Sequence, residues 1–356
     1  MGRLNDKVAI ASTVFRAMSR SHRMSVIAAA TAVSLLLVGV ASRRADAAPR
    51  PDAIQADPVG GRVLGLSAIC DECKPEKFTA ECTGFLEGPV FDRDGTLWVL
   101  GILKGVIWRV TPDGHCSVGI QLPPEVKFPS GLRFAQDGTL YGVAMGYGLF
   151  SVDLPSKKVT PLATGTSLGG LPDGAFHGLD DLFIDHTGGM YLTDAAGSSV
   201  LNPIGQLFYR DAGGNIRKIV SGLMFPNGVV LSPDEKMLYI DEWAANRILA
   251  VPVVAPGVLN TGWSYVFATL HGGHGPDSMT ADSAGNVYVA HYGAGEVLAF
   301  APNGDYFGAI RLPAGAGNNP TNLAFHNGHL YITESEKGEI WRVKAKIPGI
   351  NLYGGS

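Results

Sequence analysis

Six short segments of the chain each begin with a residue that a repeat would bring to one point in space. The six residues are Glu87, Ser130, Asp180, Asn227, Asp277 and Thr321. Three are carboxylates, one is a carboxamide and two are hydroxyls. Three crowded carboxylates repel one another unless a cation lies among them. Because His and Cys are absent from the set, the oxygen ligands favour a hard divalent cation, Ca²⁺ before Mg²⁺. The alternative, that these residues only cap turns, explains any one position but not four together.

The segments that follow these residues share one pattern. An apolar residue stands four places after the first, a turn with Gly, Asp or Asn comes next, and an aromatic residue closes the second half. The closing aromatics are Trp98, Tyr141, Tyr191, Tyr239, Tyr288 and Tyr331. Successive segments start 43 to 50 residues apart, which is the length of a four-stranded antiparallel blade.

The repeat predicts an all-β fold, a six-bladed β-propeller with four-stranded antiparallel blades. Third strands are expected at residues 104–110, 148–152, 205–210, 247–251, 296–300 and 339–343. An outer strand from residues 63–68 or 78–83 is expected to close the ring against the last blade. The first residues of the segments then converge at one end of the central channel. The 47 glycines and the 17% of charged residues fit a chain of many short strands and turns.

The first part of the chain has a different composition. Basic residues precede an apolar run at residues 24–41, and Ala45-Asp46-Ala47 ends it with small residues. We therefore expect a signal peptide at residues 1–47, a linker at 48–61 and the propeller at 62–350. The protein would be exported, to the periplasm or outside the cell, without a membrane association after cleavage. An uncleaved anchor is the alternative, since the run is 18 residues long.

Charge and cysteine content narrow the function classes. The whole chain carries a net charge of −4, and without residues 1–47 it carries −9. Nucleic acid is not an expected partner, because no basic patch interleaved with aromatics occurs. Cys70, Cys73, Cys82 and Cys116 are expected to form one or two structural disulfides, with three pairings possible.

Four motifs carry a resemblance to a known family. They are Glu87-Gly88-Pro89, Asp180-Asp181-Leu182, Phe225-Pro226-Asn227-Gly228 and Gly275-Pro276-Asp277-Ser278. The chain from about Phe85 to about Val343 resembles the senescence-marker-protein, gluconolactonase and luciferin-regenerating-enzyme family. It is most similar to the drug-responsive lactonase branch, in which Gly-Pro-Asp-Ser occurs with the pattern of residues 292–300. The resemblance implies that Glu87, Asn227 and Asp277 are metal ligands and Asp180 the fourth group.

The oxygen ring and the resemblance together suggest a metal-dependent hydrolase that opens a lactone, its small-molecule substrate. A metal-polarised carbonyl would be attacked by water, with Asp277 or Asp180 as the general base, or by Asp277 itself. Other candidates for the substrate pocket are the two hydroxyl positions of the ring and residues near the expected channel mouth. These candidates are Ser130, His177, Trp243, His274, Ser278 and Thr321. Alternatives are a phosphotriesterase with the same metal ring and a binding propeller without catalysis.

Overall fold

The fold is seen in a computed structural model, which describes residues 63–165 and 176–350 of the 356-residue chain. The expected signal peptide and linker, residues 1–61, lie outside the described residues. No helix in the described ranges is long and apolar enough to span a membrane.

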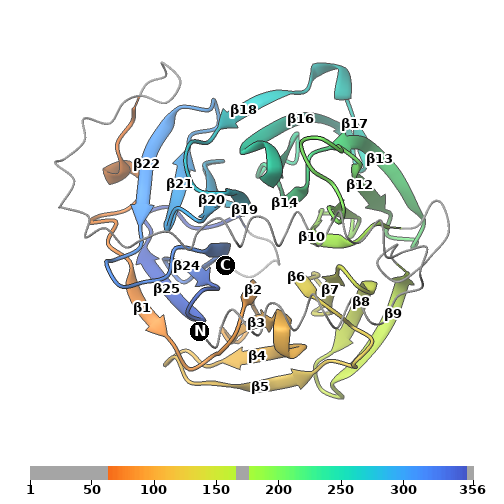
Figure 1. Ribbon diagram of the computed structural model, residues 1–356, viewed down its shortest axis with the longest axis horizontal. Helices are drawn as coiled ribbons and strands as arrows, with labels where there is room; N and C mark the ends of the chain where they lie inside the picture. Colours follow the sequence, from red (N-terminus) through yellow and green to blue (C-terminus); the bar gives the residue numbers. More distant parts are fainter. Residues whose placement is uncertain (1–62, 166–175, 351–356) are drawn as a thin grey trace. The chain divides into compact units, whose positions relative to one another are not determined.

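The described residues form six antiparallel sheets, arranged as a six-bladed β-propeller (Figure 1). Each sheet contributes one innermost strand, and these strands pack against one another around the axis. The innermost strands are β2 (Leu86–Phe91), β6 (Pro129–Phe134), β10 (Leu179–Ile184), β14 (Pro226–Leu231), β19 (Gly275–Ala281) and β23 (Pro320–His326). The second strands are β3 (Leu97–Gly101), β7 (Leu140–Ala144), β11 (Met190–Asp194), β15 (Met237–Glu242), β20 (Val287–Tyr292) and β24 (His329–Glu334).

The third and outer strands complete each blade. The third strands are β4 (Val106–Val110), β8 (Gly148–Asp153), β12 (Gly205–Arg210), β16 (Arg247–Ala255), β21 (Glu296–Phe300) and β25 (Glu339–Lys344). The outer strands are β5 (Cys116–Gln121), β9 (Lys158–Thr164), β13 (Ile216–Leu223), β18 (Tyr265–Thr269), β22 (Tyr306–Arg311) and β1 (Glu76–Thr79). Short 3₁₀ helices are η1 (Leu66–Ala68), η2 (Ile102–Lys104), η4 (Trp243–Ala245) and η5 (Thr261–Trp263). The predicted fold class is confirmed, and the blade of β14 has one extra short strand, β17 (Val258–Leu259), beside β16.

The ring is closed by a strand from the start of the propeller. β1 pairs antiparallel with β25 and becomes the outer strand of the last blade. This strand overlaps the expected 78–83 segment. The other expected segment does not close the ring, since Val63 only bridges to Tyr306 of β22 and η1 follows it. The last blade is therefore built from both ends of the repeat region, which leaves no gap in the ring.

Turn chemistry explains why the first two strands of several blades form. Asp92 accepts N–H groups of Asp94 and Thr96 through one carboxylate oxygen, and its other oxygen accepts the indole N–H of Trp98 at 2.8 Å. Asp282 also accepts two backbone N–H groups of its turn through one carboxylate oxygen, and its other oxygen accepts the hydroxyl of Tyr288 at 2.9 Å. The Asp residue therefore fixes the tight turn and holds the aromatic that packs at the blade interface.

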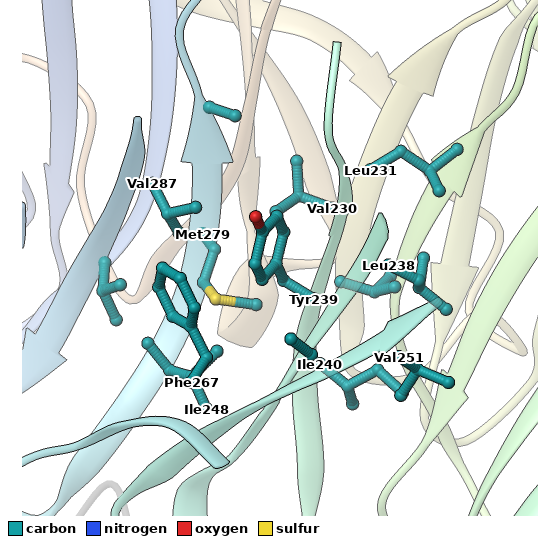
Figure 2. Packing of buried hydrophobic residues seen from close by; sticks show 14 of the residues in the cluster. Val230, Leu231, Leu238, Tyr239, Ile240, Ile248, Val251, Phe267, Met279 and Val287 are labelled. Atoms are coloured by element: carbon teal, nitrogen blue, oxygen red, sulfur yellow. The ribbon is translucent and has the colours of Figure 1, made fainter. Parts of the chain in front are cut away.

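Adjacent blades are held together by apolar packing. Tyr239 of β15 lies against Phe267 of β18, with ring centroids 4.8 Å apart, and Met279 of the neighbouring β19 packs into the same cluster (Figure 2). Met279 is fully buried. Truncating a side chain in such a position typically costs about 2–5 kcal/mol, so these contacts contribute strongly to blade alignment.

Two disulfides are present, and they settle the pairing. Cys70 pairs with Cys73, and Cys82 with Cys116. The second bond joins the chain between β1 and β2 to β5, so it links the closing strand of the last blade to the outer strand of the first. It spans 34 residues, whereas the first spans 3.

The longer disulfide is expected to matter more for stability. Replacing Cys82 and Cys116 with Ser should lower the free energy of unfolding by about 4 kcal/mol, from the chain entropy of a loop of that length. Replacing Cys70 and Cys73 with Ser should cost about 1.5 kcal/mol by the same reasoning. Denaturant unfolding of both double variants checks this, and an equal loss in the two would contradict it.

Candidate active site

Every innermost strand has a β-bulge beside its ring residue. The register with the second strand shifts between Glu87 and Val90 in β2, between Leu179 and Leu182 in β10, and at the matching place in the other four strands. A bulge adds an unpaired residue and re-aims side chains locally. The six predicted positions therefore share one special backbone feature, at the end of the propeller where the innermost strands begin. We call this end the mouth face.

Four of the six ring residues form one electrostatic group. The amide of Asn227 donates to Asp277 Oδ1 at 2.8 Å, across two neighbouring blades. The carboxylate of Glu87 interacts with those of Asp277 and Asp180, and the carboxylates of Asp180 and Asp277 interact with each other. All four side chains belong to buried residues that retain a small exposed fraction. The structure thus brings together the four residues predicted as metal ligands.

Burial shifts the titration of the three carboxyl groups upward. Burial, and then the charge of Asp277, raise the pKa of Glu87 well above its ordinary value. Burial and the same neighbour raise the pKa of Asp180 well above its ordinary value. Burial raises the pKa of Asp277 to about 8, although the Asn227 hydrogen bond opposes this shift. Without a positive charge nearby, burial therefore favours the protonated forms of these carboxyl groups.

The donor chemistry of the ring fits a hard divalent cation. Asp180 Oδ2 is buried and has no hydrogen-bond partner among the described residues, and buried polar atoms are rarely left so. Within residues 63–165 and 176–350, however, no three His, Cys, Asp or Glu side chains form a group that could hold a metal by themselves. A cation at the ring would therefore need the amide oxygen of Asn227 as well as carboxylates.

Ser130 and Thr321, the two hydroxyl positions of the ring, make contacts between blades. The Ser130 hydroxyl donates to the carbonyl of Leu179 at 3.2 Å, and the Thr321 hydroxyl donates to that of Leu86 at 2.8 Å. Thr321 is fully buried. These hydroxyls join neighbouring innermost strands, and Ser130 also bonds the carboxylate of Asp180, which opposes the rise of its pKa.

A second layer of polar residues lies directly beside the ring, and sequence reasoning missed most of it. Ser278, predicted at the pocket, donates its hydroxyl to Asp181 Oδ2 at 2.8 Å. Burial raises the pKa of Asp181, while the charge of the buried Arg133 lowers it. Burial and the charge of Asp277 raise the pKa of Asp241 well above its ordinary value, although a hydrogen bond from the Gly228 backbone opposes this shift. The sequence signals for this layer were Ser278 of the Gly-Pro-Asp-Ser motif and the Asp180-Asp181 doublet.

The remaining predicted pocket residues lie on the mouth face. His177 is half-buried, with its ring 3.6 Å from Asp194 and 3.1 Å from the amide of Gln206. Trp243 begins η4 and lies against Phe225, with ring centroids 5.5 Å apart. His274 is exposed and tilted against Tyr292 at 5.8 Å.

Tyr292 ends β20, which pairs with the strand that carries Asp277, and so lies on the mouth face near Asp277. Burial and the charge of Asp277 raise its pKa, and its ring stacks with Phe85 at 6.4 Å. Phe225 lies two residues before Asn227, as Phe85 lies two residues before Glu87. The shared place of these two aromatics just before the innermost strands was a signal that could have identified them from the sequence.

Buried carboxylates at the ends of second strands hold the chain that leads into three innermost strands. Asp194 accepts the backbone N–H groups of His177 at 2.9 Å and Gly178 at 2.6 Å. Glu242 accepts the N–H of Met224, and Glu334 accepts the N–H of Asn319. These bonds fix the backbone immediately before Asp180, Asn227 and Thr321, so they position the ring.

Residues 85–336 match the family model described as the SMP-30/gluconolactonase/LRE-like region. The chain belongs to this family. Lactonase drp35 of Staphylococcus aureus (strain MRSA252) is 31% identical over 236 residues, which are 64% of this chain and 70% of that relative. Lactonase drp35 of Staphylococcus haemolyticus (strain JCSC1435) is 31% identical over 235 residues, with the same shares covered. The family resemblance expected from the motifs is therefore confirmed.

Solved structures share the fold of this family member. A gluconolactonase from Xanthomonas campestris superposes with a TM-score of 0.67 at 19% identity, covering 82% of this chain and 96% of that one. Regucalcin from Agrobacterium tumefaciens, described as a calcium-binding protein, gives a TM-score of 0.65 at 22% identity, covering 78% and 95%. Family and fold together support a lactonase-type hydrolase with a small-molecule substrate.

The raised pKa values predict how the metal-free protein responds to pH. Because the folded-state pKa values of Glu87, Asp180 and Asp277 lie above the unfolded ones, their protonation favours folding. This contribution is complete below the unfolded values of about 4 and is lost as pH rises through the folded ones, about 8 for Asp277. Thermal unfolding in chelator should therefore show a falling Tm between about pH 4 and 8.

Two further measurements separate this effect from general pH sensitivity. Asp277→Asn removes one titrating group, so the slope of Tm against pH in chelator should become shallower. Asp137→Asn, on an exposed turn where the carboxylate accepts the N–H of Thr139, is the control and should leave the slope unchanged. A flat profile for the unaltered protein would contradict the prediction.

Asp194 is expected to stabilise the backbone before Asp180. Asp194→Asn keeps the shape but weakens two bonds from backbone N–H groups, so it should lower the free energy of unfolding by about 1–3 kcal/mol. Hydrogen exchange of the His177 and Gly178 amides should accelerate more than that of the outer strands. Exchange that accelerates equally throughout would mean that Asp194 acts on global stability and not on this segment.

Proposed function

We propose that the protein is a metal-dependent lactonase whose ring of Glu87, Asp180, Asn227 and Asp277 is the catalytic centre. The observation that carries the proposal is the convergence of three buried carboxyl groups and one carboxamide on the mouth face of a fold from a lactonase-containing family. Such a cluster is costly for folding alone, and a functional site is the usual reason for it.

Glu87, Asn227 and Asp277, with Asp180, would hold the divalent cation, Ca²⁺ in the first instance. When bound, the cation supplies a Lewis acid for the carbonyl oxygen of the substrate. The chain's own residues provide the rest. Asp277 is the proposed general base for the attacking water, because Asn227 orients its carboxylate through Oδ1. Asp180, with an oxygen free of hydrogen bonds, is the second candidate for the same proton.

The proposed location is outside the cytoplasm. Residues 1–47 have the composition of a cleaved signal peptide, and the chain has two disulfides with no free cysteine among the described residues. Disulfides persist in oxidising compartments. Both features support export to the periplasm or the medium.

The test is hydrolysis of a panel of γ- and δ-lactones, with paraoxon as a phosphotriester, by the purified protein. Activity on lactones should disappear with chelator and return with Ca²⁺. Asp277→Ala should lower kcat by about 10²–10⁴, the usual contribution of a general base. Asp305→Asn, at a half-buried residue just before β22 and far from the ring in the sequence of the blade, should leave kcat unchanged.

Three outcomes would contradict parts of the proposal. Metal binding without turnover of any lactone would overturn the lactonase assignment, and turnover of paraoxon alone would indicate a phosphotriesterase. Chelator-resistant activity would overturn metal dependence. Single turnover in H₂¹⁸O tests direct attack by Asp277: if water cleaves the resulting anhydride at the Asp277 carbonyl, the label enters Asp277 and the first product lacks ¹⁸O, whereas general-base catalysis labels the product and leaves Asp277 unlabelled.

A further inference from the structure

One loop on the mouth face exposes an unusual number of apolar side chains. Residues 195–204 connect β11 to β12, and the side chains of Val200, Leu201 and Ile204 are 51%, 96% and 39% exposed. A single exposed aliphatic residue is ordinary, but several on one short loop cost solvation free energy without a packing gain. Such a group on a loop suggests contact with an apolar ligand.

The loop starts directly beside the catalytic ring. Asp194, the last residue of β11, pairs with Leu179, the residue before Asp180. The N–H groups of Ala195 and Ala196 both donate to the carbonyl of Gly178, at 3.0 and 3.4 Å. The base of the loop is therefore bonded to the backbone that leads into Asp180.

The other side of the loop is anchored to the next blade. The Ser198 hydroxyl donates to the carbonyl of Leu223 at 2.6 Å and accepts the N–H groups of Gly205 at 3.0 Å and Phe225 at 3.1 Å. Phe225 lies two residues before Asn227. Because one buried hydroxyl makes three bonds, the loop has a defined position between the strands that carry Asp180 and Asn227.

An aromatic surface continues from the loop toward Asp277. The Phe225 ring contacts that of Trp243, and both side chains are half-buried. The backbone of Trp243 packs so closely on Gly275 that a Cβ there would lie 2.2 Å from the Trp243 carbonyl oxygen. Gly275 is two residues before Asp277. Arg247, which follows η4 at the start of β16, is paired with the carboxylate of Glu242.

We propose that residues 195–204, with Phe225 and Trp243, bind the hydrocarbon substituent of the lactone, so that the substrates are alkyl- or aryl-substituted lactones and not polyhydroxylated sugar lactones. The inference rests on the proposed function. It names the substrate class and assigns specificity to Val200, Leu201 and Ile204. A sugar lactone would place hydroxyl groups against these side chains and leave them without hydrogen-bond partners.

The first test is a homologous series of γ-valerolactone, γ-nonalactone and γ-undecalactone, with glucono-δ-lactone for comparison, all below their aggregation limits. Each methylene that enters an apolar contact should raise kcat/KM about two- to fourfold. Glucono-δ-lactone should be the poorest substrate. A kcat/KM that is independent of chain length, or highest for glucono-δ-lactone, would overturn the inference while leaving the lactonase assignment intact.

The second test uses variants of the loop. Leu201→Ser and Val200→Ser should each lower kcat/KM for γ-undecalactone at least fivefold more than for γ-valerolactone. The matched control is Val254→Ser, because Val254 is 68% exposed near the far end of β16, away from the mouth face. Equal losses for both lactones would show that the loop only supports the structure of the site.

A binding measurement distinguishes failure of this inference from failure of the proposed lactonase function. If no lactone is turned over, titration calorimetry of γ-undecalactone still tests the apolar surface by itself. Binding that is lost in Leu201→Ser but kept in Val254→Ser would support the surface. Absence of binding to the unaltered protein would overturn it.

Discussion

The rest of the structure depends on the repulsion among three carboxyl groups buried together at the axis. Glu87, Asp180 and Asp277 come from three different blades, and each lies in a region from which water is largely excluded. Burial raises the pKa of each, and the charge of Asp277 adds to the rise for Glu87 and Asp180, so the folded chain favours protons or a positive charge there. Apolar contacts between blades, such as those of Tyr239, Phe267 and Met279, must offset this cost.

A closed ring is well suited to hold such a cluster. Bulges at the start of every innermost strand re-aim the ring residues, and buried acceptors such as Asp194 hold the backbone just before them. Hydroxyl bonds from Ser130 and Thr321 join one innermost strand to the next. The pairing of β1 with β25 prevents the blades from separating at the one place where the chain is not continuous. A site assembled from separate blades can therefore keep its geometry despite internal repulsion.

The strands of the blades form the shared scaffold, whereas the loops of the mouth face are expected to set substrate specificity. The family shares the fold at low sequence identity, as the superposition with gluconolactonase and regucalcin illustrates. Strand interiors are constrained by packing between blades, whereas the loops of the mouth face are free to vary in length and polarity. Residues 195–204 form the longest described loop of that face that joins two strands of one blade. This loop also exposes three large aliphatic side chains. Differences among relatives in substrate are expected to arise in such loops.

The sequence by itself determined the blade count, the third strands and the four ligand candidates, because a repeat fixes register and the Gly-Asp turns mark it. For example, the strands β12 and β21 begin and end where the pattern places them. The tertiary structure decided what depends on contacts between distant segments. It selected Glu76–Thr79 as the closing strand, paired Cys82 with Cys116, and turned the hydroxyls of Ser130 and Thr321 toward neighbouring strands. It also brought Asp181 and Asp241 beside the ring, since a local pattern cannot tell which side chains of a bulged strand face the axis.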